Sequence, residues 1–153
     1  MILGVRHVGF VVASVVKSQD FYQGLGFEAE GEPKEESGPM ISQLVGIEGV
    51  LIKTLKMQLR RSAEGLWREG GFRLELIEYL VPVGLTVVQE SNNVIAKGHM
   101  CFTVEDVGAV VKQILELGGS SPFEAVLDGA GNPTMTYVLD PDGIPIELNV
   151  QVH

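Results

Sequence analysis

Two parts of this chain repeat each other, and the repeat constrains the fold more than any other feature of the sequence. The segment His7-Val-Gly-Phe-Val-Val12 matches His99-Met-Cys-Phe-Thr-Val104 at an offset of 92 residues. Further along, Arg73-Leu-Glu-Leu76 matches Pro145-Ile-Glu-Leu148 at an offset of 72. The matches keep their order, and each is anchored on a potential metal ligand. We therefore predict one domain over 1–153 built from two similar modules, 1–82 and 96–153.

Both modules show the same order of elements: a strand, a helix and three further strands. In the second module, apolar residues at helical spacing follow Glu105-Asp106, which offers an N-cap, and Gly118-Gly119 ends the helix. In the first module a helix is expected to begin at Ser14 or Ser18 and to end at Gly26. The predicted strands are 5–12, 27–31, 50–58, 72–80, 98–104, 122–127, 133–139 and 144–151, with a turn at 140–143 before the last one. The expected fold class is α+β, with two βαβββ modules.

The change of offset places about 20 extra residues of the first module between Gly26 and Arg73. Segment 32–48 is expected to form a polar loop and a short amphipathic helix. Segment 59–71 is expected to be a second loop, in which we interpret Trp67 as an apolar anchor.

The candidate site follows from the alternation of side chains along the strands. Residues two apart share a face, so His7 and His99 each lie on one face of an opening strand, and Glu75 and Glu147 each lie on one face of a closing strand. If equivalent faces of the two modules pack together, the four side chains converge. Imidazole nitrogen and carboxylate oxygen are ligands for Ni, Co, Zn, Mn or Fe, and the donor set does not choose among these metals.

Each of these residues also has a structural interpretation. A single His in an apolar strand is more often a hydrogen-bonded structural residue, and a Glu in a strand often faces solvent, as we expect for Glu78 on the face opposite Glu75. Structural roles do not predict that both modules place a His on the first strand and a Glu on the last. The repetition therefore favours a shared metal site.

The same segments resemble the vicinal oxygen chelate superfamily, which includes glyoxalase I, methylmalonyl-CoA epimerase, fosfomycin-resistance enzymes, bleomycin-binding proteins and extradiol dioxygenases. The resemblance covers nearly the whole chain and is carried by segments 7–12, 18–27, 74–80, 98–104 and 140–148. It implies paired βαβββ modules whose strands curl into a cleft around a metal. It also implies that His7, Glu75, His99 and Glu147 are the metal ligands, in agreement with the repeat.

The ligand set is similar to that of glyoxalase I, which implies proton transfer next to a carbonyl or enolate oxygen. Glu147 or Glu75 would act as the base and return the proton as an acid. Methylmalonyl-CoA epimerase is similar in length but carries Gln at the place of Glu75. The expected class is a metal-dependent lyase or isomerase.

Three other functions stay open at this point. Ring-cleaving dioxygenases and fosfomycin-type transferases of the superfamily generally use two His and one Glu, so the second carboxylate of this chain argues against both. A protein that only sequesters a drug or other small molecule is a further alternative. Inward-facing carboxylates are costly without a cation, which argues against such a protein.

Other residues of the same strand faces are candidates to line the cleft. We expect Arg73, Tyr79, Thr103 and Asn149 to contact a small-molecule substrate, whose identity the sequence does not reveal. The single cysteine, Cys101, is expected to pack as a small apolar group rather than to act as a nucleophile.

The composition of the chain argues against some classes of binding partner and location. The chain has 20 acidic against 11 basic residues and a net charge of −9, which argues against nucleic acid because phosphate binding needs clustered Lys and Arg. No apolar run reaches the roughly 18 residues of a membrane span, and no signal peptide is recognised. One cysteine suits a reducing compartment, so a cytoplasmic location is expected. The resemblance implies a homodimer, and whether the four ligands come from one chain or two is left open.

Overall fold

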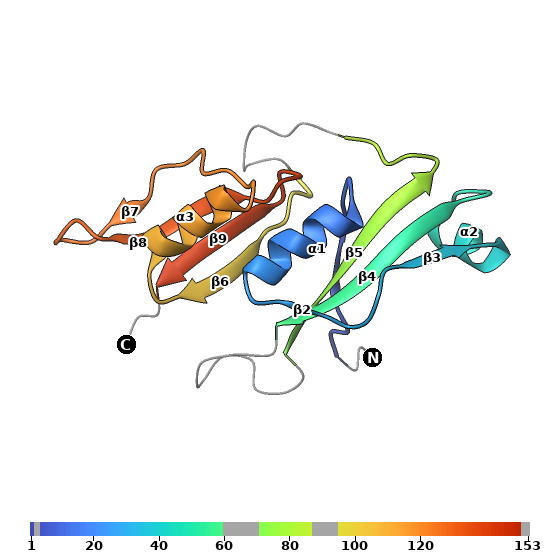
Figure 1. Cartoon of the computed structure of the whole chain (residues 1–153), viewed down its shortest axis with the longest axis horizontal. Coiled ribbons are helices and arrows are strands. Elements are labelled where there is room, and N and C mark those ends of the chain that lie inside the picture. Colours follow the sequence, from blue (N-terminus) through green and yellow to red (C-terminus); the bar gives the residue numbers. More distant parts are fainter. Residues whose placement is uncertain (2–3, 60–70, 87–94, 151–153) are drawn as a thin grey trace. The chain divides into compact units, whose positions relative to one another are not determined.

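A computed structural model describes residues 1, 4–59, 71–86 and 95–150 of the chain. The chain divides into two compact units, Met1–Leu85 and Thr86–His153. Each unit consists of a sheet and at least one helix, as Figure 1 shows. Trp67 and most of segment 59–71 lie outside the described residues.

The first unit contains a mixed sheet with the strand order β1-β5-β4-β2, and β3 also pairs with β4. The long strands β4 and β5 run antiparallel, while the edge strand β1 runs parallel to β5. The elements are β1 (Val8–Val11), α1 (Val15–Gly24), β2 (Glu28–Ala29), β3 (Lys34–Ser37), α2 (Pro39–Val45), β4 (Leu51–Leu59) and β5 (Phe72–Val81).

Helix α1 packs on one face of this sheet and encloses the core of the unit. Phe21 and Tyr22 are buried on the helix, and Leu74 and Leu76 are buried on the sheet face that carries even-numbered residues of β5. Burial of apolar side chains stabilises this contact by about 25 cal/mol per Å² removed from water. The odd-numbered face of β5 carries the polar Arg73 and Glu75, followed by Ile77 and Tyr79, which pack against the apolar cluster of Ile41, Val50 and Ile52.

Glu78 lies on the face that α1 covers, and the expectation that it is solvated is wrong. Its Oε2 accepts a hydrogen bond from the backbone N–H of Val15 over 2.9 Å. The N–H groups of the first helical turn have no partner within the helix, and a carboxylate also interacts favourably with the helix dipole there. Ser14 is the N-cap residue, so the helix begins at the first of the two predicted positions.

The extra segment of the first unit is more ordered than its polar sequence predicts. The predicted short helix is present as α2, but residues 34–37, expected in a loop, form β3 along β4. All of β3 is exposed, so hydrogen bonding to β4, and not burial, accounts for the strand. Ile41 of α2 is buried with Val50 and Ile52 in a small apolar cluster, against which Tyr79 packs.

The second unit repeats the first without the extra segment. Its sheet has the order β6-β9-β8-β7, with β6 parallel to β9 and the other pairs antiparallel. Helix α3 packs against β8 and β9. The elements are β6 (Met100–Val104), α3 (Val107–Glu116), β7 (Val126–Leu127), β8 (Pro133–Leu139) and β9 (Pro145–Val150), so the strand expected over 122–127 is limited to its last two residues.

The ends of α3 follow the sequence signals. Asp106 is the N-cap, and its carboxylate accepts the N–H of Ala109 over 2.9 Å. After the helix, Gly118 adopts a φ of 89°, in the left-handed region that favours glycine. The predicted turn at 140–143 is held by the buried Asp140, which accepts the N–H groups of Asp142 and Ile144.

The two units share strand order as well as sequence, which confirms the α+β class with a repeated βαβββ pattern. In both, the opening strand lies parallel beside the closing strand and a helix joins the opening strand to the rest. Among the described residues, no helix has the length and apolar character required to cross a membrane.

Candidate metal centre

The first unit brings His7 and Glu75 together, and we call this pair the first half-site. Gly9 of β1 is the register partner of Glu75 on β5, and His7 is the residue directly before β1. The His7 Nε2 and Glu75 Oε2 atoms are 3.0 Å apart. Lys56, opposite Glu75 on β4, places its Nζ 3.8 Å from the other carboxylate oxygen.

The second unit brings His99 and Glu147 together in the same way, and this pair is the second half-site. Cys101 is the register partner of Glu147, as Gly9 is of Glu75. The His99 Nε2 and Glu147 Oε2 atoms are 3.2 Å apart. Both glutamate side chains are 17% exposed, whereas those of His7 and His99 are 32% and 43% exposed, so in each half-site the histidine is the more accessible residue.

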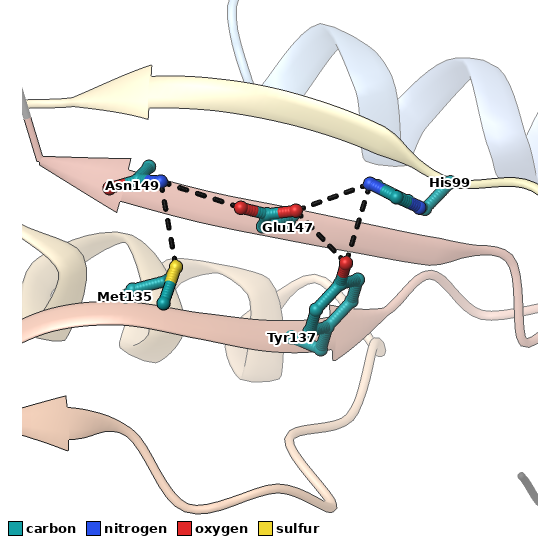
Figure 2. Close-up of polar contacts among 5 residues, drawn as sticks. All are labelled: His99, Met135, Tyr137, Glu147 and Asn149. Carbon is teal, nitrogen blue, oxygen red and sulfur yellow. Dashed lines mark hydrogen bonds and ion pairs between the residues drawn. The ribbon is translucent and has the colours of Figure 1, made fainter. Parts of the chain in front are cut away.

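Tyr137 is a site residue that the sequence analysis missed. Figure 2 shows its hydroxyl between the two residues of the second half-site. The hydroxyl donates to Glu147 Oε2 over 2.9 Å and lies 3.3 Å from His99 Nε2. Tyr137 is the register partner of Glu147 on β8, so only the pairing of β8 with β9 reveals it.

Asn149 supports the other side of the same carboxylate. Its amide Nδ2 donates to Glu147 Oε1 over 3.4 Å and lies 3.6 Å from the sulfur of Met135 (Figure 2). The sequence analysis expected Asn149 to contact substrate, and in the structure it contacts the candidate metal ligand. Both carboxylate oxygens of Glu147 thus accept a hydrogen bond, Oε2 from Tyr137 and Oε1 from Asn149.

Burial, together with the nearby Glu147 carboxylate, raises the pKa of Tyr137 and of Cys101. Partial burial, then the hydrogen bond to Glu147 and its negative charge, raise the pKa of the Tyr137 phenol. Burial and the Glu147 charge likewise raise the pKa of the Cys101 thiol. A raised pKa keeps a thiol protonated at neutral pH, and the thiolate is the nucleophilic form. Cys101 is exposed and therefore does not pack as a core residue, and its raised pKa disfavours the nucleophilic thiolate.

The remaining predicted substrate contacts lie on the same strand faces. Arg73 forms an ion pair with Glu30 over 3.2 Å and leaves about half of its side chain exposed. Tyr79 packs against the α2 cluster, and Thr103 is exposed on β6 opposite Asn149. Contact of these residues with a substrate stays a prediction.

The donors of each half-site fit a divalent metal ion. An imidazole nitrogen and a carboxylate oxygen lie side by side, and both types bind first-row metals. Each carboxylate also has a further polar partner, as metal-bound carboxylates commonly do. In the part of the chain that the structure describes, no cluster of three or more His, Cys, Asp or Glu residues is arranged to hold an ion. That both half-sites share one ion stays a prediction.

Comparison with protein families decides the family. The model of the Glyoxalase/Bleomycin resistance protein/Dioxygenase superfamily matches residues 4–148. The chain belongs to this superfamily. A comparison with curated proteins found no match.

Solved structures of the glyoxalase superfamily share the fold. A glyoxalase family protein from Bacillus cereus is 22% identical, with a TM-score of 0.80, over 100% of this chain and 97% of that one. Glyoxalase I from Leishmania major, described as trypanothione-dependent, is 25% identical, with a TM-score of 0.55, over 94% and 84%. The fosfomycin resistance protein FosX from Listeria monocytogenes, complexed with Mn(II) and sulfate, is 18% identical, with a TM-score of 0.60, over 99% and 95%. The superfamily thus includes metal-containing enzymes.

Proposed function

We propose that this protein is a metal-dependent lyase or isomerase that transfers a proton next to a carbonyl or enolate oxygen of a small-molecule substrate, as in glyoxalase I or an epimerase. The observation that carries the proposal is the duplicated His–Glu pair, with nitrogen-to-oxygen distances of 3.0 and 3.2 Å. The proposed metal ligands are His7, Glu75, His99 and Glu147, supplied by one chain or by two chains of a homodimer.

A divalent ion held by these side chains would stabilise the negative charge that develops on a substrate oxygen as a proton leaves the neighbouring carbon. Glu147 or Glu75 takes that proton as a base and returns it as an acid. Both carboxylates are more than four-fifths buried beside a histidine, so a proton held on either is shielded from bulk water. The substrate contacts proposed with this site are Arg73, Tyr79, Thr103 and Asn149.

The location and assembly are part of the proposal. Cys101 is the single cysteine, and unpaired thiols suit a reducing compartment, which supports the cytoplasm. The superfamily resemblance supports the homodimer.

The test is proton exchange in D₂O, followed by NMR on small carbonyl compounds with an acidic neighbouring C–H, including 2-oxoaldehyde–thiol adducts and acyl thioesters. The protein is first reconstituted separately with Ni, Co, Zn, Mn and Fe. Exchange by the wild type, its loss in Glu147→Gln or Glu75→Gln, and its retention in Glu116→Gln on the exposed surface of α3 would support the proposal. Exchange that survives unchanged in both active-site variants would refute the assigned base. A protein that binds no metal after reconstitution would instead favour a small-molecule-binding protein.

A further inference from the structure

Among the described residues, the second half-site has a feature that the first lacks, namely a hydroxyl shared by its histidine and its glutamate. Tyr137 Oη, His99 Nε2 and Glu147 Oε2 lie within 3.3 Å of one another, with separations of 2.9, 3.2 and 3.3 Å. In Figure 2 the phenol points from β8 to the gap between the imidazole and the carboxylate. Polar atoms from β8, from β9 and from His99, the residue directly before β6, thus meet at one point.

The directions of the hydrogen bonds leave room for an ion. A carboxylate oxygen has two lone pairs, and the Tyr137 hydroxyl occupies one on Glu147 Oε2. The other is free for a metal when His99 Nε2, 3.2 Å away, carries no proton, as a metal-binding imidazole nitrogen requires. Asn149 fixes the opposite oxygen over 3.4 Å, so the carboxylate is held at both ends by neutral donors. These two contacts restrict rotation of the carboxylate before an ion binds. Less conformational entropy is then lost when the ion fixes the carboxylate in one orientation.

The Tyr137 ring also restrains the histidine. It meets the His99 ring edge to face, with centroids 5.2 Å apart and an interplanar angle of 76°. Phe123 also packs against the Tyr137 ring, with the two ring centroids 6.4 Å apart. The phenol is therefore supported by packing, and its hydroxyl position does not depend on the hydrogen bonds alone.

In the first half-site, the residue opposite the glutamate is a lysine instead of a tyrosine. Lys56 stands opposite Glu75 as Tyr137 stands opposite Glu147, but its ammonium is 3.8 Å from the carboxylate and the side chain is 46% exposed. An ammonium on a flexible four-carbon chain attracts a carboxylate without fixing its orientation. Directional support is therefore a property of the second half-site.

We propose that Tyr137 is a positioning residue for the metal, acting through its hydroxyl on Glu147 and through its ring on His99. The inference rests on the metal site of the proposed function and names the group that prepares two of its four ligands. Outer partners of metal ligands commonly account for about 10–100-fold in metal affinity. We expect Tyr137 to fall in this range.

The test is the Tyr137→Phe variant, which removes the hydroxyl and keeps the ring against His99 and Phe123. Mn(II) and Co(II) binding are measured by calorimetric titration, and the Co(II) absorption spectrum reports the ligand geometry. We expect Kd to rise about 10–100-fold and the Co(II) spectrum to change. Thr134→Val is the matched control, because it removes a hydroxyl of the same strand whose bond runs to the Val126 carbonyl. Its Kd should equal that of the wild type.

A double-mutant cycle separates positioning from a general loss of stability. If Tyr137 acts through Glu147, then Tyr137→Phe should cost little further affinity in a Glu147→Gln background. Additive losses, or a wild-type Kd and spectrum in the folded Tyr137→Phe protein, would overturn the inference and leave the metal site intact. A wild-type protein that binds neither ion would overturn both the inference and the proposed function.

Discussion

Lys56 and Tyr137 occupy the same register position in the two halves of the chain, each directly opposite the half-site glutamate on the neighbouring strand. The two halves thus share the His and the Glu but differ in the residue opposite the glutamate. Glu75 has a charged, partly exposed partner, and Glu147 has a neutral, directional one. The two half-sites have the same donors but different support.

Loss of either histidine should remove most of the metal. Because losing an outer partner alone commonly costs about 10–100-fold in affinity, losing a ligand should cost more than about ten-fold. Metal content of His7→Ala and His99→Ala after reconstitution and dialysis, measured by plasma mass spectrometry, checks this expectation. His153→Ala is the control, since this third histidine has no counterpart in the repeat. Unchanged metal content in both His7→Ala and His99→Ala would refute the four-ligand site.

Gly119, the second glycine after α3, lies where the end of this helix closely approaches β8, and replacing it should destabilise the protein. A Cβ atom on Gly119 would lie 2.5 Å from the Leu139 carbonyl oxygen and 2.7 Å from a methyl group of Ile114. Since a backbone atom cannot move aside cheaply, Gly119→Ala should lower the free energy of unfolding by about 1–3 kcal/mol. Urea titration followed by circular dichroism measures the change.

Gly129→Ala provides the comparison for Gly119→Ala. A Cβ atom at Gly129 meets nothing within 4 Å, and its φ lies outside the left-handed region. Its stability should stay within about 0.5 kcal/mol of the wild type. Equal effects of the two substitutions would contradict the steric explanation.

Periodicity and the repeat were sufficient to predict the parts of the fold that follow local rules. Each His lies beside a Glu, as the repeat suggested, while the shared four-ligand site stays a prediction. The Asp106 cap and Gly118 were predictable because helix ends have local signals. The opening strands are shorter than predicted, since β1 begins at Val8 rather than at residue 5 and β6 begins at Met100 rather than at residue 98.

The misses have one physical cause, since each depends on which strand or helix lies alongside. Tyr137 joins the site through its register with Glu147, and the exposed strand β3 exists through its pairing with β4. Glu78 is partly buried and accepts a hydrogen bond from α1, because α1 begins next to it, 63 residues away in sequence. Sequence alternation predicts the face of a residue but not the neighbour across the sheet.

The Glu78 contact predicts a measurable contribution to stability. The variant Glu78→Gln keeps the size of the side chain but removes the charge that faces the N-terminus of α1. We expect the free energy of unfolding to fall by about 1 kcal/mol, the upper range for a charge at a helix end. Urea denaturation at low salt measures it, with Glu124→Gln, an exposed residue outside the helices and strands, as a control of equal charge change. A wild-type value for Glu78→Gln would show that the cap does not need the charge.

The loop between β7 and β8 predicts a stability change with pH. Asp128 accepts hydrogen bonds from the Asn132 side chain over 3.0 Å and from the Asn132 and Ala130 N–H groups over 2.8 Å, and these bonds lower its pKa from the ordinary value of 3.8. A pKa that is lower in the folded than in the unfolded state adds stability above pH 3.8, and that stability is lost as the pH falls through the folded pKa. The stability difference between the wild type and Asp128→Ala should therefore be largest near neutral pH and shrink in acid. In an NMR titration, Asn132→Ala should move the Asp128 pKa back toward 3.8, because the side-chain bond is the largest cause of the shift. A wild-type Asp128 that titrates at or above 3.8 would contradict this account of the loop.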